Sequence, residues 1–205
     1  MVAMGRKLAA AESSASTPAM QDPTEVVHAA ALSMLGELDK DRQTYRRDPA
    51  KVALLVEKYL LPHFDTEFAA RMVLGRHWSV ATPEQRQRFI AAFYHSLLTN
   101  YASALADFTS DRLQILPARV APDATRATVH TKVKGSNVMV AVDYELRKTP
   151  QGWKAWSVII EGISYVYSYR EDFGSQIESQ GIDAVIQRLE AGQKPAARKD
   201  STPTV

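Results

Sequence analysis

The spacing of apolar residues changes near residue 110, and this change constrains the fold more than any other feature. Before it, apolar side chains recur at helical intervals, as in Phe89, Phe93, Leu97, Tyr101 and Leu105. After it they alternate with polar ones, which is the spacing of a half-buried strand. Helical spacing returns near residue 170. The sequence therefore predicts an α+β fold in the order helices, sheet, helices.

Helix boundaries in the first half carry standard capping signals. Asp22 precedes Pro23, Asp48 precedes Pro49, and Asp65 opens a third helix that Gly75 ends. A fourth helix begins at Thr82-Pro83-Glu84-Gln85, where Gln85 completes a capping box. It runs to about residue 108. We therefore expect four helices between residues 22 and 108.

The central segment predicts a curved antiparallel meander of about four strands, covered on one face by helices. The strands are expected at 112–120, 125–134, 138–146 and 153–161, with turns at 135–137 and 149–152. Pro117 makes the first an edge strand or a bulged one. Helices follow at about 170–179 and 182–189, on either side of Gly181.

At 205 residues, the chain is long enough for one domain with a substantial core. We expect a flexible segment at 1–21, a single domain at 22–190 and a disordered tail at 191–205. Residues 1–20 lack the apolar core of a secretory signal, so this stretch reads as a leader remnant or an added segment. No apolar run approaches the roughly 18 residues of a membrane-spanning helix.

The sequence offers little for catalysis or metal binding. It has no cysteine, which excludes disulfides and thiolate chemistry, and a net charge of +2 without a Lys/Arg run, which argues against a nucleic-acid surface. Its five histidines do not share the three- or four-residue spacing of a helical metal site. We therefore predict no catalytic residues, no metal and no cofactor.

An unusual supply of apolar and aromatic side chains leaves two possibilities open. The helices and sheet can close on a filled core, or they can bow apart and leave an apolar cleft between them. Apolar spacing alone does not separate the two.

Several segments together resemble the MlaC / Ttg2D (toluene-tolerance) family of periplasmic phospholipid-binding proteins of Gram-negative bacteria. The matching stretches are 59–62, 73–78, 81–86, 89–93 with Leu97, Tyr101 and 104–105, then 153–156, 161–164 and 181–183. The resemblance runs from about residue 22 to about residue 189. No single motif carries it; the order and spacing of the motifs do.

The resemblance implies a periplasmic carrier without catalytic activity. Such a protein holds glycerophospholipid as cargo, with the acyl chains in a cleft and the head group near solvent. It shuttles lipid between the outer membrane and an inner-membrane ABC transporter, which maintains lipid asymmetry. The implied partners are an outer-membrane lipoprotein–porin complex and a membrane-anchored MCE-domain ring with its permease and ATPase.

On this basis we predict which residues line the lipid site. From the helices and the segment before the long helix they are Val73, Leu74, Trp78, Phe89, Phe93, Leu97 and Tyr101. From the sheet and the segment after it they are Val140, Val142, Tyr144, Trp156, Val158, Ile160, Tyr165 and Tyr167. A one-residue error in strand facing would move a whole strand's side chains to the other surface. Charged substitutions at Phe93 or Val142 are expected to abolish lipid binding in a folded protein.

Two other functions remain open at this point. One is a small enzyme of the NTF2-like type, with a dry pocket in which His95 or Glu161 acts as acid or base. The other is a ligand-free interaction module with a filled core. A catalytic pocket needs convergent polar groups, and the predicted apolar set offers almost none.

Overall fold

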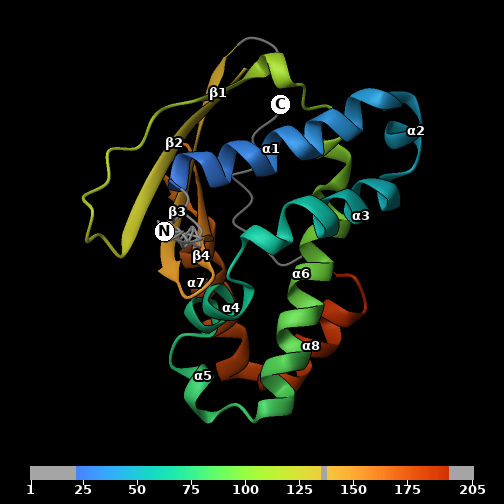
Figure 1. The fold of residues 1–205 in the computed structure, drawn as a ribbon. Coiled ribbons are helices and arrows are strands. Elements are labelled where there is room, and N and C mark those ends of the chain that lie inside the picture. The colour runs from blue at the N-terminus through green and yellow to red at the C-terminus, as the bar shows by residue number, and fades with distance from the viewer. Residues whose placement is uncertain (1–21, 135–137, 194–205) are drawn as a thin grey trace, which may run out of the picture.

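The computed structural model describes residues 22–134 and 138–193. Helices come first, a sheet follows, and helices close the chain, as the apolar spacing predicts (Figure 1). The predicted flexible segment 1–21, the turn at 135–137 and nearly all of the predicted tail lie outside the described residues. None of the described helices combines the length and apolar character needed to cross a bilayer.

The helical first half is more divided than the sequence suggests. Its elements are α1 (Pro23–Lys40), α2 (Arg42–Arg47), α3 (Pro49–Tyr59), the 3-10 turn η1 (Leu61–His63), α4 (Thr66–Leu74), α5 (His77–Val80) and α6 (Pro83–Leu105). The short helices α2 and α5 were not predicted. Gly75 ends α4 with φ 53°, where a Cβ would stand 2.7 Å from Nε of Arg170. The positive φ therefore favours glycine at this helix end.

The predicted capping box at the start of α6 is confirmed. The N–H of Gln85 donates to Oγ1 of Thr82 at 3.1 Å, and the N–H of Thr82 donates to Oε1 of Gln85 at 2.9 Å. Both bonds satisfy donors that the first helical turn leaves without a partner. Gln85 also donates through Nε2 to Asp183 on the last helix, at 2.9 Å.

We expect Thr82→Ala to lower the free energy of unfolding by about 1 kcal/mol, because this exposed residue contributes only its cap. Urea denaturation measures the change. Thr82→Ser keeps the accepting hydroxyl and serves as the control. Equal losses for the two variants would contradict the capping role.

The sheet has five antiparallel strands in the order of the chain rather than about four. They are β1 (Leu113–Ile115), β2 (Arg126–Lys134), β3 (Met139–Thr149), β4 (Gly152–Ile160) and β5 (Ile163–Ser164), with the 3-10 turn η2 (Ser110–Arg112) before them. The first predicted strand is shorter than expected, because it ends before Pro117. The fifth consists of two residues in a segment that was not predicted as strand.

A β-bulge interrupts the pairing of β3 with β4. Glu145 pairs with Ser157 and Leu146 with Ala155, which leaves Trp156 without a cross-strand partner. Such an extra residue bends the strand and shifts its alternation by one position. As a result, Ala155 and Val158 share one face of the sheet although they are three residues apart.

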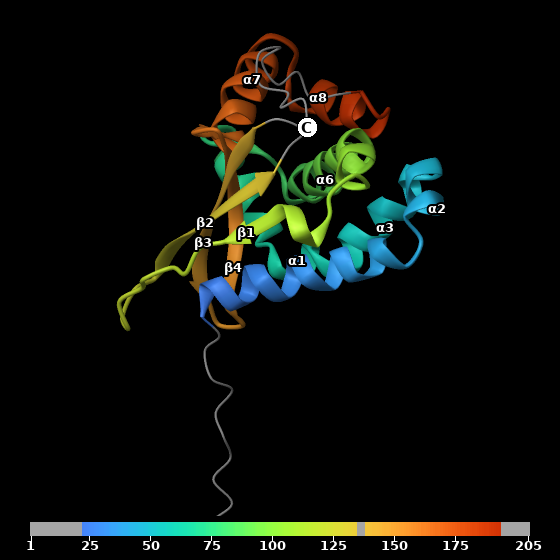
Figure 2. The same ribbon diagram turned by 90° about the horizontal axis from the view of Figure 1, so that it is seen from above.

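The inner face of the sheet, which carries Val129, Val142 and Leu146, is turned toward the helices. Val26 and Val27 of α1 pack on Val129 and Leu146 in one of the buried clusters. Figure 2 shows α1, α3 and α6 on one side of the sheet. The prediction of helices covering one face is therefore confirmed. The long helix α6 packs mainly on α3, α4 and α8 rather than on a strand.

The chain closes with α7 (Tyr165–Gln180) and α8 (Ile182–Glu190), separated by Gly181 at φ 83°. The helix α7 begins five residues earlier than predicted. Its apolar stripe therefore includes Tyr165, Tyr169, Phe173 and Ile177, one every fourth residue. This stripe packs against α4 and α6 in the largest buried cluster.

Candidate functional site

Eight of the predicted lining residues meet in the helical core. Five are buried there, and Trp78, Leu97 and Tyr165 pack against them; the buried five are Val73, Leu74, Phe89, Phe93 and Trp156. Phe93 stacks on Phe89 with ring centroids 5.6 Å apart, and Tyr169 meets its ring edge-on at 5.2 Å. These side chains form a packed core in this structure.

The predicted sheet residues form a second group on the inner face. Val140 and Val142 are buried, and Tyr144, Val158 and Ile160 pack partly buried against them. The register explains the grouping: Val142 faces Ile160 and Tyr144 faces Val158 across β3 and β4.

Tyrosines of α6 and α7 mark the border of the helical core. The hydroxyls of Tyr101 and Tyr169 lie 3.2 Å apart, in hydrogen-bond contact. The ring of Tyr165 lies 6.4 Å from that of Tyr101 and 6.1 Å from that of Tyr169. Burial raises the pKa of Tyr144, of Tyr165 and of Tyr169 above the usual value, so all three phenols stay neutral. Neutral phenols suit an apolar surface with one polar contact.

The fifteenth predicted residue, Tyr167, stands apart. Its side chain is 47% exposed, whereas its neighbours on α7, Val166 and Tyr169, are buried. Tyr169 and Phe173, both buried in the helical core, were not among the predicted residues. Their four-residue spacing from Tyr165 was the signal, but it was hidden because the helix was expected to begin at residue 170.

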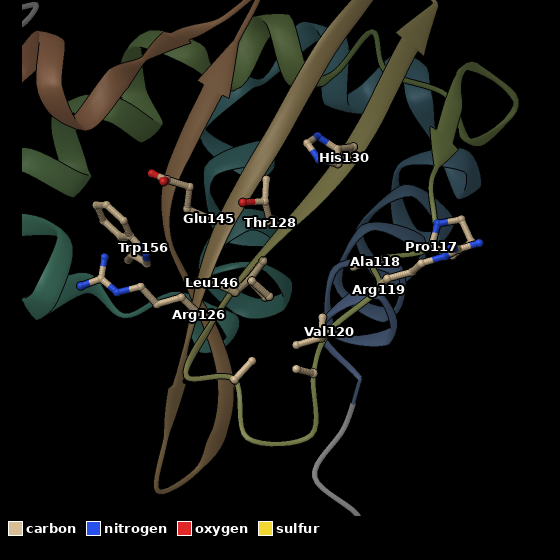
Figure 3. A pocket seen from close by; sticks show the side chains of 13 residues that line it. Pro117, Ala118, Arg119, Val120, Arg126, Thr128, His130, Glu145, Leu146 and Trp156 are labelled. Carbon is tan, nitrogen blue, oxygen red and sulfur yellow. The ribbon is translucent and has the colours of Figure 1, made fainter.

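An open pocket of about 590 Å³ lies away from most of the predicted lining and shares only Trp156 with it. Its walls come from the connection between β1 and β2 and from the neighbouring strands. Figure 3 shows Ala118 and Val120 on one side and Arg126, Thr128 and Glu145 on the other. This pocket was not predicted. The expected cleft between sheet and helices stays a prediction.

The two candidate acid–base groups of the enzyme hypothesis lie on the surface. His95 is exposed on α6, and Glu161 is exposed in the turn between β4 and β5. Oε1 of Glu161 accepts a hydrogen bond from the N–H of Ala141, as expected for a carboxylate that satisfies neighbouring backbone. Neither group has the dry surroundings that would tune it for proton transfer.

Comparisons of the sequence and of the structure with known proteins all point to one protein family. The family model described as "MlaC protein" matches residues 29–191. The chain is 32% identical over 169 residues to the toluene tolerance protein ttg2D of Pseudomonas putida, with 82% of this chain and 78% of that protein covered. It is 22% identical over 172 residues to the intermembrane phospholipid transport system binding protein MlaC of Haemophilus influenzae, covering 82% and 80%.

A solved structure extends the comparison to three dimensions. The phospholipid-binding protein of Ralstonia solanacearum, determined in complex with a phospholipid, superposes with a TM-score of 0.78 at 30% sequence identity. The superposition covers 84% of this chain and 97% of that one. The similarity therefore includes nearly the whole of the solved protein.

Proposed function

This chain belongs to the MlaC protein family, and from that premise we propose that it binds phospholipid and carries it between membranes. The single observation that carries the proposal is the phospholipid held by the Ralstonia solanacearum protein, which shares this fold over 97% of its length. The Haemophilus influenzae relative belongs to an intermembrane phospholipid transport system. The function is binding and transfer rather than catalysis.

The acyl chains are proposed to lie between the inner face of the sheet and the helical core. Two features support this place. Tyr144, Val158 and Ile160 are only partly buried although they face the helices. The helix α6, on the other side, makes its main contacts with other helices. The hydroxyls of Tyr101 and Tyr169, which lie in hydrogen-bond contact with each other, would border the chains.

Burial of the acyl chains supplies the binding energy. Each methylene removed from water contributes about 0.8 kcal/mol, so a cleft that covers two chains holds the lipid tightly. Release then requires either that the cleft opens or that a partner receives the chains at the same time. The head group, which stays near solvent, would be selected less strongly than the chains.

The proposal also includes the compartment in which the protein works and the complexes with which it exchanges lipid. We place the protein in the periplasm, between an outer-membrane lipoprotein–porin complex and an inner-membrane ABC transporter with an MCE-domain ring. Membership in the family and the named transport system of one relative support this placement.

Organic extraction of the natively purified protein, followed by mass spectrometry, tests the proposed function. We expect glycerophospholipid at a ratio near one molecule per chain. A protein with no lipid, even after incubation with phospholipid vesicles, would contradict the carrier function and favour a ligand-free interaction module with a filled core.

A further inference from the structure

The strand β2 has an open edge along nearly half of its length. Its neighbour β1 pairs only with the end that contains Thr131, Lys132 and Val133. The N–H of Leu116 then donates to the C=O of His130 at 2.9 Å. Among the described residues this is the last main-chain hydrogen bond along that edge. From Arg126 to Val129 the edge has no neighbouring strand within the part of the chain that the structure describes.

The hydrogen-bond pattern shows which groups face this opening. The N–H of Lys148 donates to the C=O of Thr125 at 2.9 Å, so Thr125 belongs to a hydrogen-bonded pair with β3. Such pairs alternate along an antiparallel ladder, so Ala127 and Val129 also bond to β3. Arg126 and Thr128 therefore turn their N–H and C=O groups outward. Both residues line the 590 Å³ pocket (Figure 3).

The two sides of this edge differ in chemistry. On the inner side, the small apolar side chains of Ala118, Val120, Ala124 and Ala127 pack against a buried cluster and line the pocket. On the outer side, β2 exposes a row of cationic and polar side chains at every second position: Arg126, Thr128, His130, Lys132 and Lys134.

The charge of the outer side is predominantly positive. Arg119, from the connection between β1 and β2, adds a further exposed cation. Two carboxylates on β3 oppose these charges: Asp143 lies 3.0 Å from His130, and Glu145 is the one acidic residue among the pocket's lining residues. Arg119, Arg126, Lys132 and Lys134 have no ion-pair partner among the described residues.

We propose that the open edge of β2 binds an extended segment of a partner protein as an added strand. Its main chain would bond to Arg126 and Thr128. Its side chains would alternate between acidic residues, beside Arg126, and small apolar residues, against Ala118 and Val120. The open stretch from Arg126 to Val129 accommodates about four residues, at roughly 3.3 Å each. This inference does not depend on the lipid site.

The chain's own N-terminal segment is the competing occupant. Thr24, in the first turn of α1, accepts a hydrogen bond from the N–H of Ala118 at 2.9 Å, so the chain enters the fold beside the pocket. However, residues 1–21 contain one acidic residue, Glu12, and therefore lack the alternating acidic side chains that the edge would select.

Fluorescence polarisation with the full chain tests the proposal. The probe is a labelled eight-residue peptide of alternating valine and glutamate, compared with one of alternating valine and lysine. We expect the glutamate peptide to bind and the lysine peptide not to bind. No binding of the glutamate peptide at millimolar concentration, or equal binding of both peptides, would overturn the proposal.

Thr128→Pro isolates the main-chain contribution. Proline removes the outward N–H without breaking a bond to β3, so the edge tolerates it. We expect it to weaken peptide binding about tenfold or more, which corresponds to about 1.4 kcal/mol. Thr128→Val keeps the N–H and should bind like the unchanged protein. Equal affinity of the proline and valine variants would contradict strand addition.

Two further variants keep the test informative if the proline variant misfolds. Arg126→Glu should lose the glutamate peptide and gain binding of the lysine peptide; an unchanged preference would refute the charge assignment. Deletion of residues 1–21 should leave the affinity unchanged. A tenfold or greater rise on deletion would identify this segment as the occupant and overturn the partner proposal.

Discussion

Phe93→Ala is expected to lower the free energy of unfolding by about 3–5 kcal/mol, the range for deleting a buried phenyl ring. Its side chain is 3% exposed and touches the rings of Phe89, Tyr169 and Phe173. Removing it leaves a cavity where α6 and α7 meet. Urea denaturation of the delipidated protein measures the loss without the stabilisation that bound lipid adds.

His95→Ala is the matched control, two residues further along the same helix. Its side chain is exposed, so a change within about 0.5 kcal/mol is expected. A loss below about 1 kcal/mol for Phe93→Ala would show that its ring is not part of the packed core. The sequence-based expectation that a charge at Phe93 leaves a folded protein is at odds with this burial, because an ion would enter a closed aromatic cluster.

Val158→Lys is expected to remove most of the bound phospholipid while the protein stays folded. Val158 is partly buried on the inner face opposite Tyr144. A lysine at this position would bring an ammonium group to the proposed place of the acyl chains. A lysine can turn its charged end toward solvent from a partly buried position, which protects the fold but not the apolar cleft. Extraction and mass spectrometry should give only a small fraction of the lipid that the unchanged protein carries.

Ile159→Lys gives the control for this variant with the same residue change on the opposite face. Ile159 pairs with Asp143, so a lysine there meets an opposite charge on the outer side. It should retain its lipid. If both variants lose lipid equally, the loss does not depend on the inner face, and the proposal that this face lines the lipid site is wrong. If both retain it, the acyl chains lie elsewhere.

The fold was largely predictable because its signals are local. Capping residues such as Thr82 and Asp65 mark helix starts within one turn, and the side chains of each accept the expected hydrogen bond. Alternation in β2 likewise matches the observed burial of Val129, Thr131 and Val133. These features depend on neighbours in sequence, so periodicity and residue type were sufficient.

Features that depend on distant pairing were not predictable in this way. The bulge at Trp156 arises between β3 and β4, and it alone places Ala155 and Val158 on one face. Strict alternation would have separated them. The pocket beside β2 has a similar origin, since it requires the connection after β1 to leave the edge at Leu116. The apolar residues of α6 were correctly identified, but spacing could not tell a packed core from a cleft wall.

The meeting of α6 with α8 has a consequence for how the chain acquires its structure. Arg88 on α6 forms a two-bonded ion pair with Glu190, the last residue of α8, at 2.9 and 3.0 Å. Phe89 and Phe93 are covered by Phe173, Val185 and Ile186, which arrive some ninety residues later. A chain emerging from a ribosome therefore cannot complete its helical core until its last helix is free. The aromatic side chains of α6 therefore stay without part of their cover until synthesis of the chain is nearly finished.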